Sequence, residues 1–383
     1  MVAAYFDHNA TTPVDPRVWR EMSPWLGPMH GNPSSIHAFG QRAREAVEGA
    51  REEVGRLLNA APPEIVFMAS GTEANNTVLQ AVAHQGGLRG HLVVSAVEHP
   101  SVETTARVLA AGGMEVTWVR PDSQGRVDAE EMVAAVREDT RLVCLVLANN
   151  VVGTLQPVAA VASACRQIGV PVLCDAVQAV GKIPVHVAEL EVDYLTLGAH
   201  KFYGPLGAAA LWAANKAPWE PLLTGGSQER RRRAGTENVP AIVGMGKAAA
   251  LARLELEDRQ AHFSHLRRHF EVGLGQISDV IVHGAEADRL VNTSHVAFVG
   301  VDNQSLLIRL DLAGFAVSAG SACSSGTVEP SDTLLAMGVS HQEALSAIRV
   351  SFGHSNSIEE VDRFLAELRQ QVAELRRLTA AAP

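Results

Sequence analysis

Short apolar segments alternate with helical patterns over residues 41–201, and this alternation constrains the fold more than any other feature of the sequence. Runs rich in β-branched and aliphatic residues predict strands at 65–68, 91–95, 115–119, 142–147, 170–174 and 194–197. Helical spacing predicts helices before and between them, at 41–58, 73–84, 100–111 and 158–168. Such alternation predicts an α/β fold with a mainly parallel sheet covered on both faces. In sheets of this kind, ligands bind at the carboxyl ends of the strands.

The pattern changes after about residue 240. A long helical region, roughly 240–277, leads into strands and helices that end with a helix over 358–378. A chain of 383 residues is long enough for about two domains. We therefore predict a large domain over residues 15–254 and a small domain made of residues 1–14 and 255–383.

The charge and cysteine content exclude several classes of partner. The net charge of −10 argues against broad binding of nucleic acid or anionic membranes. No apolar run approaches the roughly 20 residues of a membrane-spanning helix, and the N-terminus resembles no signal peptide. The four cysteines show no CxxC spacing, which predicts neither a metal site nor a disulfide framework. We expect a cytoplasmic protein.

Two charged residues follow predicted strands and together indicate cofactor chemistry. Lys201 lies between a predicted buried strand and a Gly-Pro turn, where a lysine can have a lowered pKa and attack a carbonyl group. Asp175 precedes it by 26 residues, about one strand–helix–strand unit. An aspartate at this place either caps a helix or pairs with the ring nitrogen of pyridoxal 5′-phosphate, which then acts as an electron sink.

A third segment, 70–75, connects a predicted strand to a helix and reads Ser-Gly-Thr-Glu-Ala-Asn. Small residues and a hydroxyl group at a helix N-terminus form an anion site, because free N–H groups and the helix dipole face the ligand. Alone, the segment would be an ordinary helix cap. With Asp175 and Lys201 nearby, a cofactor phosphate becomes its natural ligand.

Motifs in nearly the whole chain, from residue 5 to about 353, resemble the NifS/IscS cysteine desulfurases of the class-V aminotransferase family. They are YFDHNATTP (5–13), GNPSSIH (31–37), SGTE (70–73), AHK (199–201), GTEN (235–238), GSACSSG (320–326) and EPS (329–331). The resemblance implies a fold-type I pyridoxal-phosphate transferase. Its large domain would hold a mainly parallel seven-stranded sheet beside a smaller α/β domain, and its active sites would lie at a homodimer interface.

The resemblance also implies which residues bind the cofactor ring. Lys201 would bind it as a Schiff base, and Asp175 would pair with the ring nitrogen. Gln178 would donate a hydrogen bond to the phenolic oxygen. His99 would stack on the ring and move protons.

Further residues would hold the cofactor phosphate. The resemblance assigns Gly71, Thr72 and His200 to the phosphate of the same subunit and Thr236 to that of the neighbouring subunit. Asn150 would contact both cofactor and substrate.

Two residues would bind the substrate, and one would determine the reaction. Asn32 would contact the substrate, and the planar guanidinium of Arg349 suits its carboxylate. Small, polar neighbours predict that Cys323 lies on an exposed loop, whereas the other three cysteines are expected to be packing residues.

The resemblance implies that the Cys323 thiolate takes the sulfur of L-cysteine and leaves L-alanine. Cys323 would hold the sulfur as a persulfide for an acceptor or scaffold protein, as in iron–sulfur cluster assembly. The only metal contact implied is Cys323 as a transient iron–sulfur ligand.

Two positions depart from the family pattern. Val151 stands where a glutamate is usual, so a carboxylate is missing near the cofactor. Gly198 stands where a serine usually binds the phosphate, which predicts weaker cofactor retention.

Other functions remain open at this point. Another fold-type I enzyme, such as a selenocysteine lyase or a small-substrate aminotransferase, would use the same cofactor residues, although an aminotransferase has no use for Cys323. A non-catalytic scaffold would not need the intact set of Lys201, Asp175, His99, Arg349 and Cys323.

Overall fold

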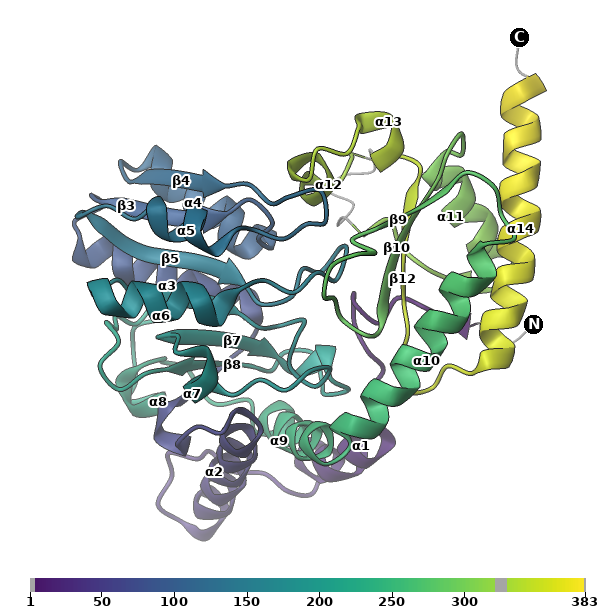
Figure 1. The fold of residues 1–383 in the computed structure, drawn as a ribbon. Helices are drawn as coiled ribbons and strands as arrows, with labels where there is room; N and C mark the ends of the chain where they lie inside the picture. Colours follow the sequence, from purple (N-terminus) through teal and green to yellow (C-terminus); the bar gives the residue numbers. More distant parts are fainter. Residues whose placement is uncertain (1–3, 321–328, 382–383) are drawn as a thin grey trace.

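A computed structural model describes residues 4–320 and 329–381 and shows a large sheet beside a second, smaller α/β region (Figure 1). Within the described residues the large sheet has seven strands, in the order β2-β8-β7-β6-β5-β3-β4. Their bounds are Ile65–Met68 (β2), His91–Ser95 (β3), Glu115–Val119 (β4), Thr140–Val146 (β5), Val172–Asp175 (β6), Tyr194–Gly198 (β7) and Ala209–Ala213 (β8). Strand β8 runs antiparallel to both of its neighbours, and the other pairings are parallel. The predicted mainly parallel sheet is confirmed.

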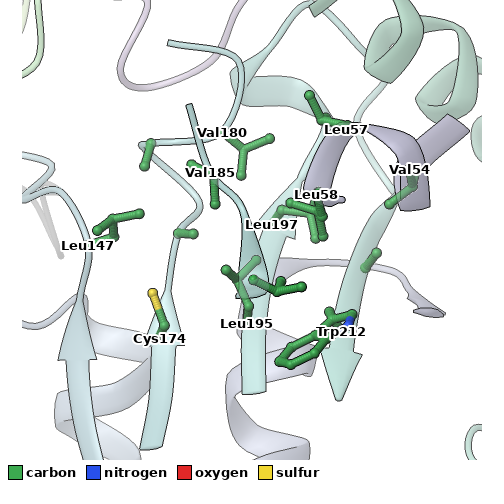
Figure 2. Close-up of a cluster of buried hydrophobic side chains, with 14 of the residues drawn as sticks. Val54, Leu57, Leu58, Leu147, Cys174, Val180, Val185, Leu195, Leu197 and Trp212 are labelled. Atoms are coloured by element: carbon green, nitrogen blue, oxygen red, sulfur yellow. The ribbon is translucent and has the colours of Figure 1, made fainter. Parts of the chain in front are cut away.

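Helices cover both faces of this sheet because successive side chains of each strand point to opposite faces. In β2, Ile65 and Phe67 belong to the core under α2, whereas Val66 and Met68 belong to the core under α3 and α4. Figure 2 shows part of the first core, where Leu58 of α2 packs with Leu197 of β7. The helices of this region are Pro16–Met22 (α1), Ala38–Leu58 (α2), Gly71–Gln85 (α3), Pro100–Ala111 (α4), Ala129–Ala134 (α5), Val158–Ile168 (α6), Val187–Leu190 (α7), Gln228–Arg231 (α8) and Val239–Leu254 (α9).

The smaller region is built on a three-stranded antiparallel sheet in the order β12-β10-β9. The strands are Val280–His283 (β9), Thr293–Phe298 (β10) and Ala347–Ser351 (β12), and the helices are Leu256–Leu274 (α10), Asn303–Leu312 (α11), Asp332–Ala336 (α12), His341–Ala344 (α13) and Ile358–Ala381 (α14). The N-terminal strand Ala4–Tyr5 (β1) pairs with Phe315–Ala316 (β11). Phe6 packs in the hydrophobic core of this smaller region, together with Phe270, Phe352 and Phe364, so the N-terminal segment belongs with the C-terminal part of the chain.

The long helical region predicted over roughly 240–277 is confirmed, and it consists of two helices, α9 and α10, interrupted at Glu255. The Glu255 carboxylate accepts hydrogen bonds from Arg17 and Arg259, which hold the chain at this break. The division into domains at residues 14/15 and 254/255 stays a prediction. None of the described helices combines the length and the apolar character that a bilayer-spanning segment requires.

Candidate active site

Most of the predicted site residues line one cavity of about 540 Å³ at the carboxyl ends of the parallel strands. Apart from Arg349, which is on β12, they lie at or just after the ends of β2, β3, β5, β6 and β7, which meet at this edge of the large sheet. The predicted residues among them are Gly71, Thr72, His99, Asn150, Asp175, Gln178, His200, Lys201 and Arg349.

Lys201 ends a short 3-10 helix, Ala199–Lys201, directly after β7. Its Nζ donates hydrogen bonds to the carbonyl oxygens of Asn9 (2.5 Å) and Ala10 (2.8 Å). Burial lowers the pKa of Lys201 to about 8, and the positive charge of Arg349 adds to the effect. A substantial fraction of this amine is therefore neutral, and so nucleophilic, near pH 8.

We expect this lowered pKa to appear in the reactivity of the cofactor-free protein. The rate at which an amine-reactive aldehyde labels Lys201 should reach half its maximum near pH 8. A lysine in a model peptide has a pKa of about 10.4 and provides the comparison. Mass spectrometry of the reduced, digested protein measures the labelling, and a midpoint above pH 10 would contradict the prediction.

Asp175 and His99 are connected by a chain of hydrogen bonds under the cavity. Asn75 donates to Asp175 Oδ2 (2.8 Å) and contacts the hydroxyl of Ser101 (2.9 Å). That hydroxyl lies 2.8 Å from His99 Nδ1. Val177 N also donates to Asp175 Oδ1 (3.0 Å), so both carboxylate oxygens accept a hydrogen bond.

This chain fixes the orientation of the two predicted cofactor contacts, Asp175 and His99. Burial lowers the pKa of His99, which leaves its ring neutral near pH 7. Neither Asn75 nor Ser101 was predicted as a site residue. Asn75 ends the segment 70–75 and Ser101 begins the predicted helix 100–111, but nothing in their local sequence indicates contact between α3 and α4.

The N-terminus of α3 also lines the cavity, through Ser70, Gly71 and Thr72. Ser70 caps the helix by accepting a hydrogen bond from Glu73 N (3.1 Å). A Cβ atom at Gly71 would lie 2.9 Å from Val177 Cγ2, so a glycine permits this close approach. The free N–H groups of the first turn make an anion site. His200 borders the same cavity, and burial lowers the pKa of its ring to about 4.

Gln178 is held by a second lysine that the sequence analysis did not identify. Lys182 is fully buried and donates hydrogen bonds to Gln178 Oε1 (2.7 Å) and Asn9 Oδ1 (3.3 Å). Gln178 Nε2 donates to the carbonyl of Asn9 (2.9 Å). The N-terminal segment thus contributes Asn9 to the surroundings of both Gln178 and Lys201.

Arg349, on β12, enters the cavity from the smaller sheet. It forms an ion pair with Asp7 (2.7 Å) and donates to the carbonyl of Asn150 (2.8 Å). Its Nε is buried and has no hydrogen-bond partner within the described part of the chain.

Three of the predicted site residues are not among the residues that line this cavity. Asn32 and Thr236 lie on exposed segments outside it. Cys323 lies outside the described residues. Their assigned roles stay predictions.

The two departures from the family pattern have different surroundings. Val151 is buried against Val152, Leu334 and Met337. Gly198 is extended (φ −126°), and a Cβ atom there would lie 3.5 Å from the nearest atom of His200, at ordinary contact distance. A serine would therefore fit at position 198.

The other three cysteines are buried packing residues, as expected. Burial raises the pKa of Cys165 to about 11 and that of Cys144 and Cys174 well above the usual value. None of these three thiols is a nucleophile near neutral pH.

Comparison with known proteins agrees with this geometry. The class-V aminotransferase family model matches residues 4–364. The cysteine desulfurase IscS of Dictyoglomus turgidum is 41% identical over 378 residues, covering 98% of this chain and 96% of the relative. The cysteine desulfurase IscS of Methanosarcina thermophila is 39% identical over 382 residues, covering 100% and 95%.

Solved structures show the same similarity. A NifS-like protein has a TM-score of 0.92 at 37% identity, covering 98% of this chain and 100% of that chain. The NifS-like protein of Rickettsia africae has a TM-score of 0.87 at 31% identity, covering 97% and 99%.

Proposed function

The chain belongs to the cysteine desulfurases of the class-V aminotransferase family. We propose that it binds pyridoxal phosphate in the described cavity and takes the sulfur of L-cysteine onto Cys323. The fold is that of pyridoxal-phosphate-dependent enzymes. The observation that carries the proposal is that one cavity joins the amine of Lys201, the carboxylate of Asp175 and the guanidinium of Arg349.

The residues present fit the cofactor. The first turn of α3, with Gly71 and Thr72, would hold the phosphate together with His200. Asp175 would pair with the ring nitrogen, since both of its oxygens are already oriented by N–H donors. Lys201 would hold the cofactor covalently. When bound, pyridoxal phosphate supplies an electron sink for a carbanion next to the substrate amino group.

The protein residues would divide the remaining tasks. Arg349 would bind the carboxylate of L-cysteine, because it lines the cavity and a planar guanidinium suits a carboxylate. Lys201, with an amine that is partly neutral near pH 8, would accept the α-proton and return a proton to carbon. His99 would assist, since its ring is neutral and held by Ser101.

The sulfur transfer itself would be a displacement at sulfur. The Cys323 thiolate attacks the substrate sulfur, a sulfur–sulfur bond forms, and the bond between the β-carbon and sulfur breaks. The electron pair remains on carbon and is protonated, which gives L-alanine. No external oxidant is required, because Cys323 becomes a persulfide as the carbon is reduced.

The products formed from L-cysteine test this function. The purified protein with pyridoxal phosphate should form one L-alanine for each L-cysteine consumed, with persulfide or sulfide appearing in step, and D-cysteine is the control substrate. Formation of a keto acid would favour an aminotransferase. Alanine formed from selenocysteine but not from cysteine would favour a selenocysteine lyase.

Replacing Gly198 by serine should strengthen cofactor retention. A serine hydroxyl fits at this position and would donate to the phosphate, and such a hydrogen bond contributes about 1.5–3 kcal/mol. We expect the cofactor to dissociate roughly 10- to 100-fold more slowly, measured by the loss of absorbance after dilution into a competing apo-enzyme. Gly198→Ala adds the same Cβ without the hydroxyl and should behave like the parent; equal rates for all three proteins would refute the idea.

A homodimer forms part of the proposal. Ile36 is 89% exposed and Leu206 is 70% exposed, so both present apolar surface that a partner subunit would bury. Ile36 and Thr236 lie on segments that a partner subunit would cover. The acceptor would be a protein that takes the persulfide sulfur, and we propose the cytoplasm as a location because a reactive thiol requires a reducing environment.

A further inference from the structure

The proposed mechanism does not use two buried histidines of the smaller sheet. His283 on β9 and His295 on β10 are cross-strand partners, and their Nδ1 atoms lie 2.9 Å apart. His283 Nε2 lies 2.9 Å from Glu343 on α13, whose side chain is 27% exposed. The three side chains form a continuous chain from the protein surface to the interior.

The number of protons on these three side chains determines which atom donates and which accepts in each contact between them. The carboxylate of Glu343 accepts, so His283 carries its proton on Nε2. His283 Nδ1 is then an acceptor, and His295 must donate to it from its own Nδ1. With both rings neutral, His295 Nε2 therefore has no hydrogen.

This nitrogen faces the backbone that leads to Cys323. His295 Nε2 is buried and has no hydrogen-bond partner among the residues that the structure describes. The Ala319 carbonyl is the nearby group to which a protonated Nε2 would donate a hydrogen bond. No hydrogen bond joins the two in the described structure. A Cβ atom at Gly320 (φ +88°) would lie 3.3 Å from Nε2, so a glycine allows the backbone to pass this close.

The same backbone is attached to Arg349 on its other side. Arg349 N donates to the carbonyl of Ser318 (2.6 Å), and Ser318 N donates to the carbonyl of Arg349 (3.3 Å). Arg349 on β12 thus pairs with His295 of β10 on one side and with Ser318 on the other. Residues 318–320 contact both side chains' strands, because Ser318 pairs with Arg349 and Gly320 passes the ring of His295. Cys323 follows Gly320 by three positions in the sequence.

One additional proton completes every contact in the chain. His283 then donates to Glu343 from Nε2 and to His295 from Nδ1. His295 donates to Ala319 from Nε2. The positive charge rests on His283, beside the carboxylate of Glu343. His283 is on β9, so it lies one strand farther from Arg349 than His295 does.

We propose that Glu343, His283 and His295 are positioning residues for the backbone at Ala319. When these three side chains together take up one proton, His295 anchors this backbone through a hydrogen bond; when the proton leaves, the backbone is released. This inference rests on the proposed role of Cys323 for its effect on the reaction. Since Cys323 must both meet the substrate and carry the sulfur away, an anchored backbone at Ala319 slows turnover.

The surroundings set the pH at which the proton is taken up. Burial lowers the pKa of both rings, while Glu343 acts to raise that of His283 and Arg349 acts to lower that of His295. These are the charged groups that act on the pair from α13 and β12 in the described structure. The proton is therefore taken up below the ordinary histidine pKa of about 6.5, and the anchor is released above it.

Glu343→Gln tests the chain without removing either buried ring. A neutral amide does not stabilise a positive charge on His283, so the uptake midpoint should move down by about one pH unit or more. Glu286→Gln is the matched control, because Glu286 is an exposed carboxylate near His283 in sequence and, in the described structure, forms no hydrogen bond or ion pair with either ring. Its midpoint should equal that of the parent.

Two measurements on the cofactor-loaded protein test whether protonation anchors Ala319 and whether the anchor slows turnover. Nitrogen NMR of the labelled histidines, assigned with His295→Asn, should show His295 protonated on Nδ1 at pH 8 and on Nε2 below the midpoint, with His283 then protonated on both nitrogens. The acid-side midpoint of alanine formation should move with Glu343→Gln by the same amount. An Nε2 that is already protonated at pH 8 overturns the anchor, and an NMR midpoint that moves without the kinetic one overturns its link to the reaction. Failure of the proposed function would appear separately, as alanine formation that does not require Cys323.

Discussion

The variant Cys323→Ala should keep its cofactor but form alanine from L-cysteine about 10³-fold more slowly than the parent, or not at all. Loss of a covalent nucleophile commonly costs an enzyme several orders of magnitude. No other described cysteine can replace it, because Cys144, Cys165 and Cys174 are buried and their thiol pKa values are raised. Cofactor absorbance and quantification of alanine in the same sample measure the two properties separately.

The structure offers a matched control for this experiment. Cys165 lies on α6, is fully buried, and has no contact with the cavity. Cys165→Ala removes a thiol of the same chemistry and should leave alanine formation within about twofold of the parent. If Cys323→Ala remained as active as Cys165→Ala, sulfur would leave the substrate by another route, and a lyase mechanism would be favoured.

The regular parts of the fold could be predicted because local patterns determine them. The predicted strands at 65–68, 91–95 and 115–119 and the helix at 100–111 have the observed bounds. Strand β8 was missed because its sequence, Ala-Ala-Leu-Trp-Ala, lacks the β-branched residues that distinguish a strand. The break at Glu255 was missed because apolar and polar residues continue with helical spacing on both sides of it.

The site was only partly predictable for a related reason. Lys201 and Asp175 follow predicted strands, so their neighbourhood follows from the topology of the sheet. Asn9 and Asp7 contact Lys201 and Arg349 through pairings that are more than 190 residues apart in sequence, and a local pattern contains no information on such contacts. The same holds for His283 and His295, which as isolated histidines in a strand would be interpreted as packing residues.

Lys201→Ala is expected to have the second large effect. Lys201 would bind the cofactor covalently and also move protons at the substrate carbon, and proton transfer by a positioned side chain alone contributes about 10²–10⁴-fold. We therefore expect alanine formation to fall by at least about 10³-fold, with faster loss of the cofactor on dialysis. The folded structure should persist, because the carbonyl of Asn9 still accepts a hydrogen bond from Gln178.

An added amine separates the chemical role of Lys201 from a structural one. Lys201→Ala leaves space for a small amine such as methylamine, which should restore part of the alanine formation in proportion to its unprotonated concentration. Lys201→Arg fills the same space with a group that stays protonated, so methylamine should not restore its activity. Restoration of both variants, or of neither while the cofactor stays bound, would mean that a different base moves the proton. The buried Lys182, which contacts Gln178 and Asn9, would then be the next residue to replace.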